Sequence, residues 1–217
     1  MDKARALLSS YAKKIVQNGL VAGPGGNLSI RTGEWMLISP SGFDLAEIDP
    51  SQWCAVDIAS GRTDAGSLKP SSELLLHLQV YRTRLNVQAI VHTHPIHCIA
   101  LGLVSRELPV LFPDQAALLG EAGFVDYVIP TTQVLADAVA EKAASADTLL
   151  LGNHGLVTLG TNLREAYYRT EVAEASARIF LLSSIIGTPK QLSAEEVRDI
   201  QALSSEAYRV SFVQNQS

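Results

Sequence analysis

The chain has 217 residues, of which 47% are hydrophobic, so it is long enough to bury one sizeable core. Its formal net charge of -5 argues against nucleic acid or an anionic membrane as a main partner. The N-terminus lacks the apolar core of a signal peptide, and no run approaches the roughly 20 apolar residues of a membrane-spanning helix. The sequence therefore predicts a single domain over residues 1–217 and a cytoplasmic location.

Helices and strands are expected to alternate irregularly along the chain. Helices are predicted over residues 3–18, from Pro70 onward, in a short segment after residue 94, over residues 163–186, and from Ser193 onward. Strands are predicted near residues 27–31, 35–39, 53–58, 87–91, 125–129 and 148–151. This order predicts a layered α/β fold, although it does not give the order of the strands.

The chain has two cysteines, Cys54 and Cys98, and both stand in apolar stretches. Small apolar thiols of this kind are commonly buried, and disulfides are rare in reducing compartments. We therefore expect two free, buried thiols.

Three histidines stand where apolar runs end. His92 and His94 follow the predicted strand over residues 87–91, and residues two apart on a strand point to one face. His154 follows the run 148–151 and precedes Gly155, where two backbones can approach closely. We expect these three imidazoles to share one cavity. A satisfied core or surface position is the alternative for any one histidine, and it is the interpretation given to His77 and His97.

Glu73 is expected in the first turn of the helix that starts at Pro70, where the helix dipole favours an ionised carboxylate. Such a carboxylate can bind a metal or act as a base, and a simple helix-start charge is the alternative. With three imidazoles it forms a donor set that suits Zn²⁺, although Mn²⁺ or Co²⁺ would also fit. Because the set lacks cysteine, it is more typical of a catalytic metal site than of a structural one.

A phosphate site is predicted beside the same helix start. Ser71 and Ser72 can offer hydroxyls and free N–H groups there. The loops Gly25-Gly26-Asn27 and Ser39-Pro40-Ser41-Gly42 can bring further N–H groups close to an anion, and Lys69 can add positive charge. Each loop alone is more simply a turn or a cap. Their adjacency to the proposed metal carboxylate favours a phosphorylated substrate.

Taken together and in order, these segments resemble the class II aldolase/adducin family, and within it the fuculose-phosphate aldolase type. The resemblance covers roughly residues 5–205 and rests on Gly26-Asn27-Leu28-Ser29, Ser39-Pro40-Ser41-Gly42, Lys69-Pro70-Ser71-Ser72-Glu73, His92-Thr93-His94-Pro95 and Asn153-His154-Gly155. It implies a three-layer α/β fold with a central, mainly antiparallel sheet flanked by helices, and a homotetramer with sites near subunit contacts.

The same resemblance implies site residues. Zinc would be held by His92, His94 and His154, with Glu73 as a ligand that can become the catalytic base. The positions that match the family's phosphate-binding residues are Asn27, Ser41, Gly42, Ser71 and Ser72.

One stretch departs from the family's pattern. Sugar-phosphate aldolases of this type place a catalytic tyrosine after the strand near residue 110, where this chain reads Leu111-Phe112-Pro113-Asp114-Gln115. Asp114 stands where the tyrosine is expected, so we predict that it shuttles a proton or holds a substrate hydroxyl. A helix N-cap is the alternative, because Asp114 precedes an apolar run over residues 116–119.

The predicted activity is that of a metal-dependent lyase. A metal on a carbonyl and a neighbouring hydroxyl stabilises the enediolate that forms when an adjacent bond breaks. The first choice is cleavage of a ketose 1-phosphate to dihydroxyacetone phosphate and an aldehyde. The alternative is decarboxylation of a phosphorylated 3-oxo sugar acid of the 3-oxo-tetronate 4-phosphate type. A remote alternative is a non-enzymatic, adducin-like interaction module, which should lack the metal ligands that this chain retains.

Overall fold

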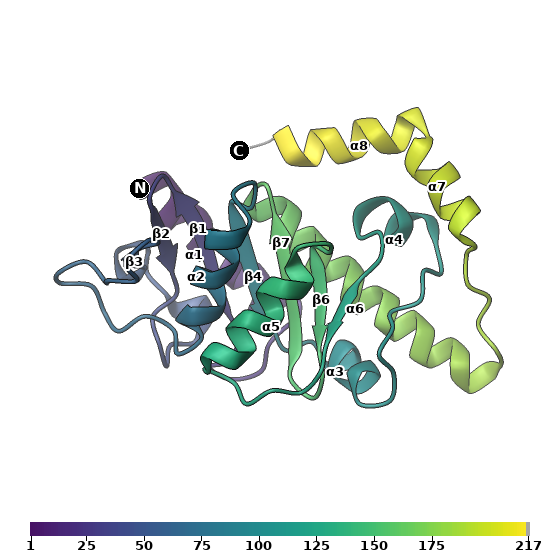
Figure 1. Ribbon diagram of the computed structural model, residues 1–217, viewed down its shortest axis with the longest axis horizontal. Coiled ribbons are helices and arrows are strands. Elements are labelled where there is room, and N and C mark those ends of the chain that lie inside the picture. The colour runs from purple at the N-terminus through teal and green to yellow at the C-terminus, as the bar shows by residue number, and fades with distance from the viewer. Residues whose placement is uncertain (216–217) are drawn as a thin grey trace.

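The computed structural model describes residues 1–215. Its strands are β1 (Asn27–Thr32), β2 (Trp35–Ile38), β3 (Cys54–Asp57), β4 (Ala89–Thr93), β5 (Gly123–Val125), β6 (Thr148–Leu151) and β7 (Gly155–Gly160). They form one sheet in the order β3-β2-β1-β4-β7-β6-β5 (Figure 1). Every neighbouring pair is antiparallel except β5 and β6, which run parallel. The predicted α/β fold with a mainly antiparallel sheet is confirmed.

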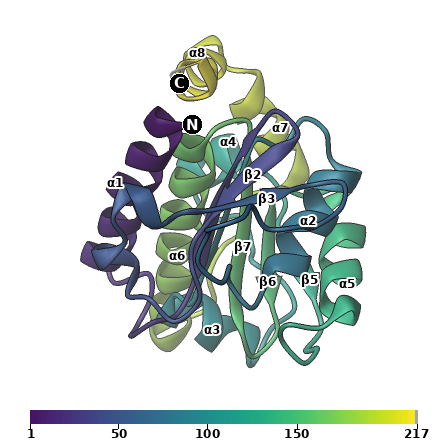
Figure 2. The same cartoon turned by 90° about the vertical axis from the view of Figure 1, so that its left-hand side faces the viewer.

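Helices cover both faces of this sheet. Figure 2 shows α2 (Leu74–Thr83) and α5 (Gln133–Ala143) on one side, and α1 (Asp2–Gln17) and α6 (Leu163–Ile186) on the other. The remaining helices are the 3₁₀ turns η1 (Leu45–Glu47) and η2 (Pro50–Gln52), and α3 (Ile96–Gly102), α4 (Pro113–Leu118), α7 (Ala194–Ala202) and α8 (Ser204–Asn215). Within residues 1–215, no helix has the length and apolar character needed to cross a membrane.

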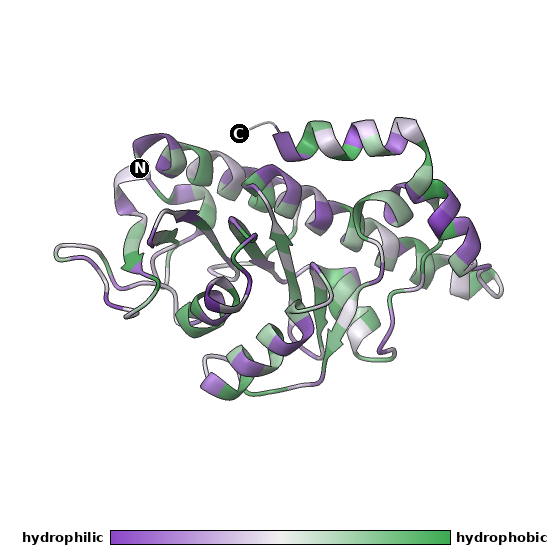
Figure 3. Ribbon diagram, turned by 45° about the horizontal axis from the view of Figure 1, so that its top comes forward, coloured by the Kyte–Doolittle hydropathy of each residue, from purple (hydrophilic) through white to green (hydrophobic). Residues whose placement is uncertain are grey.

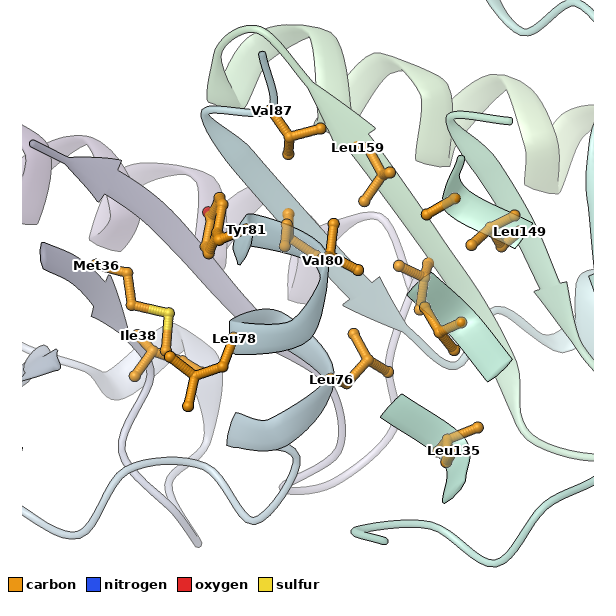
Figure 4. Packing of buried hydrophobic residues seen from close by; sticks show 14 of the residues in the cluster. Met36, Ile38, Leu76, Leu78, Val80, Tyr81, Val87, Leu135, Leu149 and Leu159 are labelled. Carbon is orange, nitrogen blue, oxygen red and sulfur yellow. The ribbon is translucent and has the colours of Figure 1, made fainter. Parts of the chain in front are cut away.

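The core is divided by the sheet into layers. Ile90 belongs to the cluster under α2 and α5, which also holds Val80 and Leu135 (Figure 4). Its neighbour Val91 belongs to the cluster under α1 and α6. Because consecutive strand residues point to opposite faces and both faces are covered, β4 reads as a continuous apolar run. In Figure 3, hydrophilic and hydrophobic residues are mixed along α1 and α5, as expected for helices with one face on a core.

Capping chemistry explains why two helices begin where the sequence predicts. The side chain of Asn162 accepts a hydrogen bond from the Glu165 N–H, and α6 then covers the whole predicted segment 163–186. Ser193 and Glu196 form a reciprocal capping box at the start of α7. The chain continues beyond α7 into α8, which the sequence reasoning did not separate from it.

Several boundaries differ from the sequence-based prediction. The helix expected from Pro70 begins at Leu74, so Ser71 and Ser72 lie in the turn before it. The strand expected near residues 125–129 lies at Gly123–Val125, and Ile129 is 66% exposed because it lies outside the sheet. The strand β7 and the helix α5 were not predicted. Cys54 and Cys98 are both free and buried, as expected.

Candidate metal centre

The four predicted metal ligands converge at one end of the sheet. His92 lies in β4, and His94 follows one residue after its end. His154 lies in the turn between β6 and β7, and Glu73 immediately precedes α2. One ligand atom from each of these four residues lies within 4.8 Å of all the others. The structure therefore brings together the whole predicted ligand set.

Strand pairing explains how residues so far apart in the chain meet. Thr93 of β4 pairs with Leu156 of β7, so the turn that carries His154 lies beside the end of β4. On the other side of β4, His92 pairs with Asn27 of β1. The Asn27 side chain in turn contacts Glu73, which joins the start of α2 to the same end of the sheet.

Gly155 makes the close approach of the two backbones possible. A Cβ atom at this position would lie 2.3 Å from the Thr93 carbonyl oxygen and 3.0 Å from His94 Cδ2. A contact of 2.3 Å is far inside normal packing distance, so any larger residue would push the His154 turn away from β4. The close approach expected from the Gly155 position is thus what places His154 beside His94.

The spacing of the donor atoms fits a small tetrahedral cation. His92 Nε2 lies 3.1 Å from His94 Nε2 and 2.9 Å from Glu73 Oε2. Glu73 Oε1 lies 3.4 Å from His154 Nε2. A zinc ion about 2.05 Å from each ligand would hold tetrahedral donors about 3.3 Å apart. These three separations are close to that value, and all four donor atoms lie within 4.8 Å of one another.

Hydrogen bonding around the ligands also fits a metal. His92 Nδ1 lies 3.0 Å from the Leu156 carbonyl oxygen, and only an N–H can satisfy that contact, so Nε2 is the ring nitrogen left to face the cluster and bind a cation. Glu73 Oε1 is buried and has no hydrogen-bond partner among the described residues. A buried carboxylate oxygen without a donor is uncommon in folded proteins, and a bound cation would satisfy it.

The electrostatics of the site favour positive charge between these groups. Burial opposes ionisation of Glu73, but His92, His154 and the Asn27 amide together hold its pKa well below the ordinary range. Burial also opposes protonation of His92, yet the Glu73 carboxylate and the Leu156 carbonyl raise the pKa of His92 above 6.5. Burial and the charge of His92 lower the pKa values of His94 and His154 to about 4. In the metal-free protein the site therefore favours positive charge at His92, whereas the lowered pKa values of His94 and His154 favour the neutral form that a metal ligand needs.

The loops predicted to bind phosphate lie side by side. The Ser41 N–H donates to the Lys69 carbonyl at 2.9 Å, and the Ser71 N–H donates to the Ser39 carbonyl at 2.9 Å. Ser71 is buried and its hydroxyl accepts from the Glu73 N–H, whereas Ser72 is exposed.

Gly42 and Lys69 are exposed too. Two small-residue loops therefore meet next to the proposed metal carboxylate, because Ser71 is only two residues before Glu73 in the sequence.

Asn27, also predicted as a phosphate ligand, lies deeper. It is 3% exposed, and its Nδ2 donates to Glu73 Oε2 at 2.9 Å. Its Oδ1 lies 2.5 Å from Nε2 of His77. The sequence reasoning did not place His77 near the site. It is fully buried and hydrogen-bonded, as expected for a core histidine, but it stands one step behind the metal carboxylate.

Asp114 does not join the cluster within its own chain. It lies in the first turn of α4, is exposed, and accepts a hydrogen bond from Arg209 Nη1 at 2.6 Å. Phe112 is the N-cap residue of α4, so Asp114 is not the cap that the alternative interpretation proposed. Arg169 bridges the Leu118 carbonyl of α4 to the Leu159 carbonyl of β7. These contacts place α4 near the end of β7 that is opposite to the His154 turn.

Comparison with known proteins identifies the family. Residues 6–181 match the model of the Class II Aldolase and Adducin N-terminal domain. The chain belongs to the class II aldolase and adducin family. This membership agrees with the resemblance drawn from the five motif segments, and the metal centre is built from three of those segments.

Similar family members are named as sugar-phosphate aldolases. An L-fuculose phosphate aldolase of Methanococcus vannielii is 40% identical over 159 residues, which cover 73% of this chain and 85% of the relative. A 5-deoxy-D-ribulose 1-phosphate aldolase of Bacillus thuringiensis serovar kurstaki is 34% identical over 206 residues, covering 92% and 94%. A solved L-fuculose 1-phosphate aldolase superposes with a TM-score of 0.87 at 32% identity, covering 95% of this chain and 96% of its own.

Proposed function

We propose that this protein is a zinc-dependent aldolase that cleaves a ketose 1-phosphate to dihydroxyacetone phosphate and an aldehyde. The observation that carries the proposal is the meeting of Glu73 with three imidazoles directly beside the two serine-containing loops. That arrangement offers a metal site, a carboxylate and an anion-binding surface at one place. The names of the similar family members favour aldol chemistry over the decarboxylation of a 3-oxo acid phosphate.

In this proposal the three imidazoles and the serine-containing loops have separate roles. A zinc ion held by His92, His94 and His154 would polarise the substrate carbonyl and stabilise negative charge on its oxygen. Ser71, with the neighbouring loop over residues 39–42, would hold the phosphate. This leaves the reacting carbons between the phosphate and the metal ligands.

Glu73 is the proton carrier in this proposal. In the direction of condensation it removes a proton from the carbon next to the carbonyl of dihydroxyacetone phosphate. In the direction of cleavage it returns that proton to the same carbon. The low pKa of Glu73 in the metal-free site makes it a weak base there, because His92, 2.9 Å away, stabilises its ionised form. Release of the carboxylate from the metal towards the substrate would free its lone pairs to accept the proton.

The test is a substrate screen on the zinc-loaded protein. We expect turnover of a ketose 1-phosphate with release of dihydroxyacetone phosphate, which is measured through a coupled reduction. The matched unphosphorylated ketose should be turned over far more slowly, and inorganic phosphate should compete with the substrate. Release of CO₂ from a 3-oxo acid phosphate, with no cleavage of any ketose phosphate, would replace this function by the decarboxylase.

The phosphate site has its own variant. Ser71→Asp puts a negative charge at the loop that would hold the phosphate, so KM should rise sharply through like-charge repulsion. The control is Ser145→Asp, which puts the same charge on an exposed serine in the turn after α5. An unchanged KM in Ser71→Asp would show that the phosphate binds elsewhere.

We also propose a cytoplasmic homotetramer in which Asp114 acts in the site of a neighbouring copy. The support is that Asp114 is exposed and lies away from the metal centre of its own chain. A mixture of Glu73→Gln and Asp114→Asn proteins tests this arrangement, because mixed tetramers regain complete sites only if two chains share each one. Random mixing should restore roughly a quarter of the sites. No recovery in tetramers shown to be mixed would exclude the shared site.

A further inference from the structure

A row of buried polar side chains runs from Glu73 into the core between β1 and α2. Asn27 and Ser29 stand two apart on β1, so they share one face of the sheet. Glu73, His77 and Tyr81 recur at every fourth residue, so they share one face of the helix and the turn before it. The two rows face each other.

Hydrogen bonds join the two rows alternately. Asn27 Nδ2 donates to Glu73 Oε2 at a distance of 2.9 Å, and Asn27 Oδ1 lies 2.5 Å from His77 Nε2. His77 Nδ1 then meets Ser29 Oγ at 2.7 Å, and Ser29 Oγ meets the Tyr81 hydroxyl at 2.8 Å. Ser29, His77 and Tyr81 have no exposed surface, and Tyr81 is visible beside the apolar side chains of α2 in Figure 4.

The chemistry of the groups means that all hydrogen bonds in this row donate in the same direction. An amide oxygen can only accept, so His77 Nε2 carries the hydrogen that meets Asn27. Burial and the charge of His92 lower the pKa of His77 to about 3, so its Nδ1 is an acceptor and the Ser29 hydroxyl donates to it. The Tyr81 hydroxyl donates to Ser29 in turn. Every hydrogen in the chain therefore points towards Glu73.

This direction selects the orientation of the Asn27 amide. If the amide turned over, its oxygen would face the Glu73 carboxylate and its NH₂ group would face a ring N–H of His77. Both contacts would then be repulsive, because like partners would meet in a buried site. The Glu73 carboxylate, which can only accept, and the N–H at His77 Nε2 together favour the observed orientation, and the Ser29 hydroxyl supports that tautomer of His77 by donating to Nδ1.

We propose that His77, Ser29 and Tyr81 are positioning residues that fix the Asn27 amide and, through it, aim the Glu73 carboxylate at the metal. The inference rests on the proposed function only for the role of Glu73 as a ligand. It also leaves one N–H of Asn27 for a substrate anion, which allows the residue to serve the phosphate as well.

Two replacements of His77 separate hydrogen-bond direction from bulk. Glutamine offers an N–H for Asn27 and an oxygen for Ser29, so His77→Gln keeps both ends of the chain. Methionine fills a similar volume but has no donor, so His77→Met breaks it. Zinc affinity is measured by competition with a chromophoric chelator, and the Co²⁺-substituted protein gives an absorption spectrum that reports ligand geometry.

We expect His77→Met to weaken zinc binding by about 10–100-fold, the usual effect of removing a group that orients a metal ligand. Its Co²⁺ spectrum should change, and kcat should fall more than KM changes. His77→Gln should stay close to the parent in all three measurements. Equal zinc affinity in the two variants would overturn the proposal.

Deletion of the Ser29 or Tyr81 hydroxyl provides a second test, which does not depend on whether the His77 variants fold. Ser29→Ala removes the donor to His77, and Tyr81→Phe removes the donor to Ser29, so zinc affinity should fall in both, and further in Ser29→Ala. The matched control is Ser176→Ala, another buried hydroxyl, which donates to the Val172 carbonyl at 2.7 Å within α6. If zinc affinity fell in proportion to the melting temperature in all three variants, the hydrogen-bonded row would contribute only to core packing, and the inference would be overturned.

The zinc measurements need no substrate, so the two proposals fail separately. Unchanged zinc affinity in His77→Met and Ser29→Ala would refute the positioning role even if ketose phosphate cleavage were found. A parent protein that binds zinc but cleaves no ketose phosphate would refute the proposed reaction. The expected graded loss of zinc affinity would still support the positioning role in that case.

Discussion

Replacement of Glu73 by glutamine tests whether this residue is a base as well as a metal ligand. Asn27 Nδ2 donates to Glu73 Oε2 at 2.9 Å, so the oxygen of the new amide should take that position. Its NH₂ group then takes the position of Oε1, 3.4 Å from His154 Nε2. An amide NH₂ has no lone pair to offer, so it can neither bind a metal nor accept a proton.

The expected effect on turnover is large and the effect on metal content is small. Three imidazoles remain, which is the usual number of protein ligands in a catalytic zinc site. Loss of a general base lowers kcat by about 10²–10⁴-fold, equivalent to about 2.7–5.4 kcal/mol of transition-state stabilisation. We expect Glu73→Gln to keep about one zinc per chain at saturating zinc.

The assay combines kcat on the preferred ketose 1-phosphate with zinc content and melting temperature. Glu171→Gln is a matched control, because that carboxylate accepts hydrogen bonds from Asn18 and Tyr167 rather than belonging to the metal centre. Near-normal turnover in Glu73→Gln would show that the base lies elsewhere. Loss of zinc in proportion to kcat would show that Glu73 serves only as a ligand.

Three further predictions follow from the same geometry. The pKa of His92 in the metal-free site is raised above 6.5, so zinc binding near pH 6.5 should release a proton from His92, and zinc affinity should rise as the pH increases through that pKa. Calorimetry in buffers of different ionisation enthalpy measures the number of protons released. Zinc binding without proton release would contradict the assignment of His92 as a ligand. Gly155→Ala should cost about 1–3 kcal/mol of stability and weaken zinc binding. The control is Gly187→Ala, which should do neither because its added Cβ atom has no neighbour within 4 Å. Equal melting temperatures of the two variants would show that the His154 turn adapts to the alanine. Asp114→Asn breaks a solvent-exposed pair with Arg209 and should change stability by at most about 1 kcal/mol, so a fall in kcat at unchanged melting temperature would support a chemical role, and unchanged kcat would remove it.

Local chemistry in the sequence was sufficient for the features that depend on neighbouring residues. The helix over residues 163–186 is set by the Asn162 cap at one end and by Gly187 at the other. The alternation of a strand directs His92 and His94 to the same cavity. Residue types that commonly bind metals, in the order found in the family, predicted the four members of the candidate metal site, and the structure brings these four residues together.

Features that depend on distant partners were placed less well. The strand β7 is a short run between two glycines, and it becomes a strand only because β4 and β6 lie on either side of it. Ser71 was expected inside a helix, but its N–H is used by the Ser39 carbonyl, which holds it in the preceding turn. The position of Asp114 relative to the metal centre could not be derived from its place in the sequence, since it depends on how α4 packs against the helices around it.

The spacing of Glu73, His77 and Tyr81 by four, and of Asn27 and Ser29 by two, is present in the sequence. Each spacing determines which side chains share a face, because helical and extended backbones have fixed periods. Only the tertiary structure decides that these two faces pack on each other, since β1 and α2 are joined by hydrogen bonds between residues 46–52 positions apart. The sequence by itself thus predicted the four residues of the candidate metal site and the local faces that carry them. The folded chain decided which faces meet, because the burial that drives their packing is shared by elements far apart in the chain.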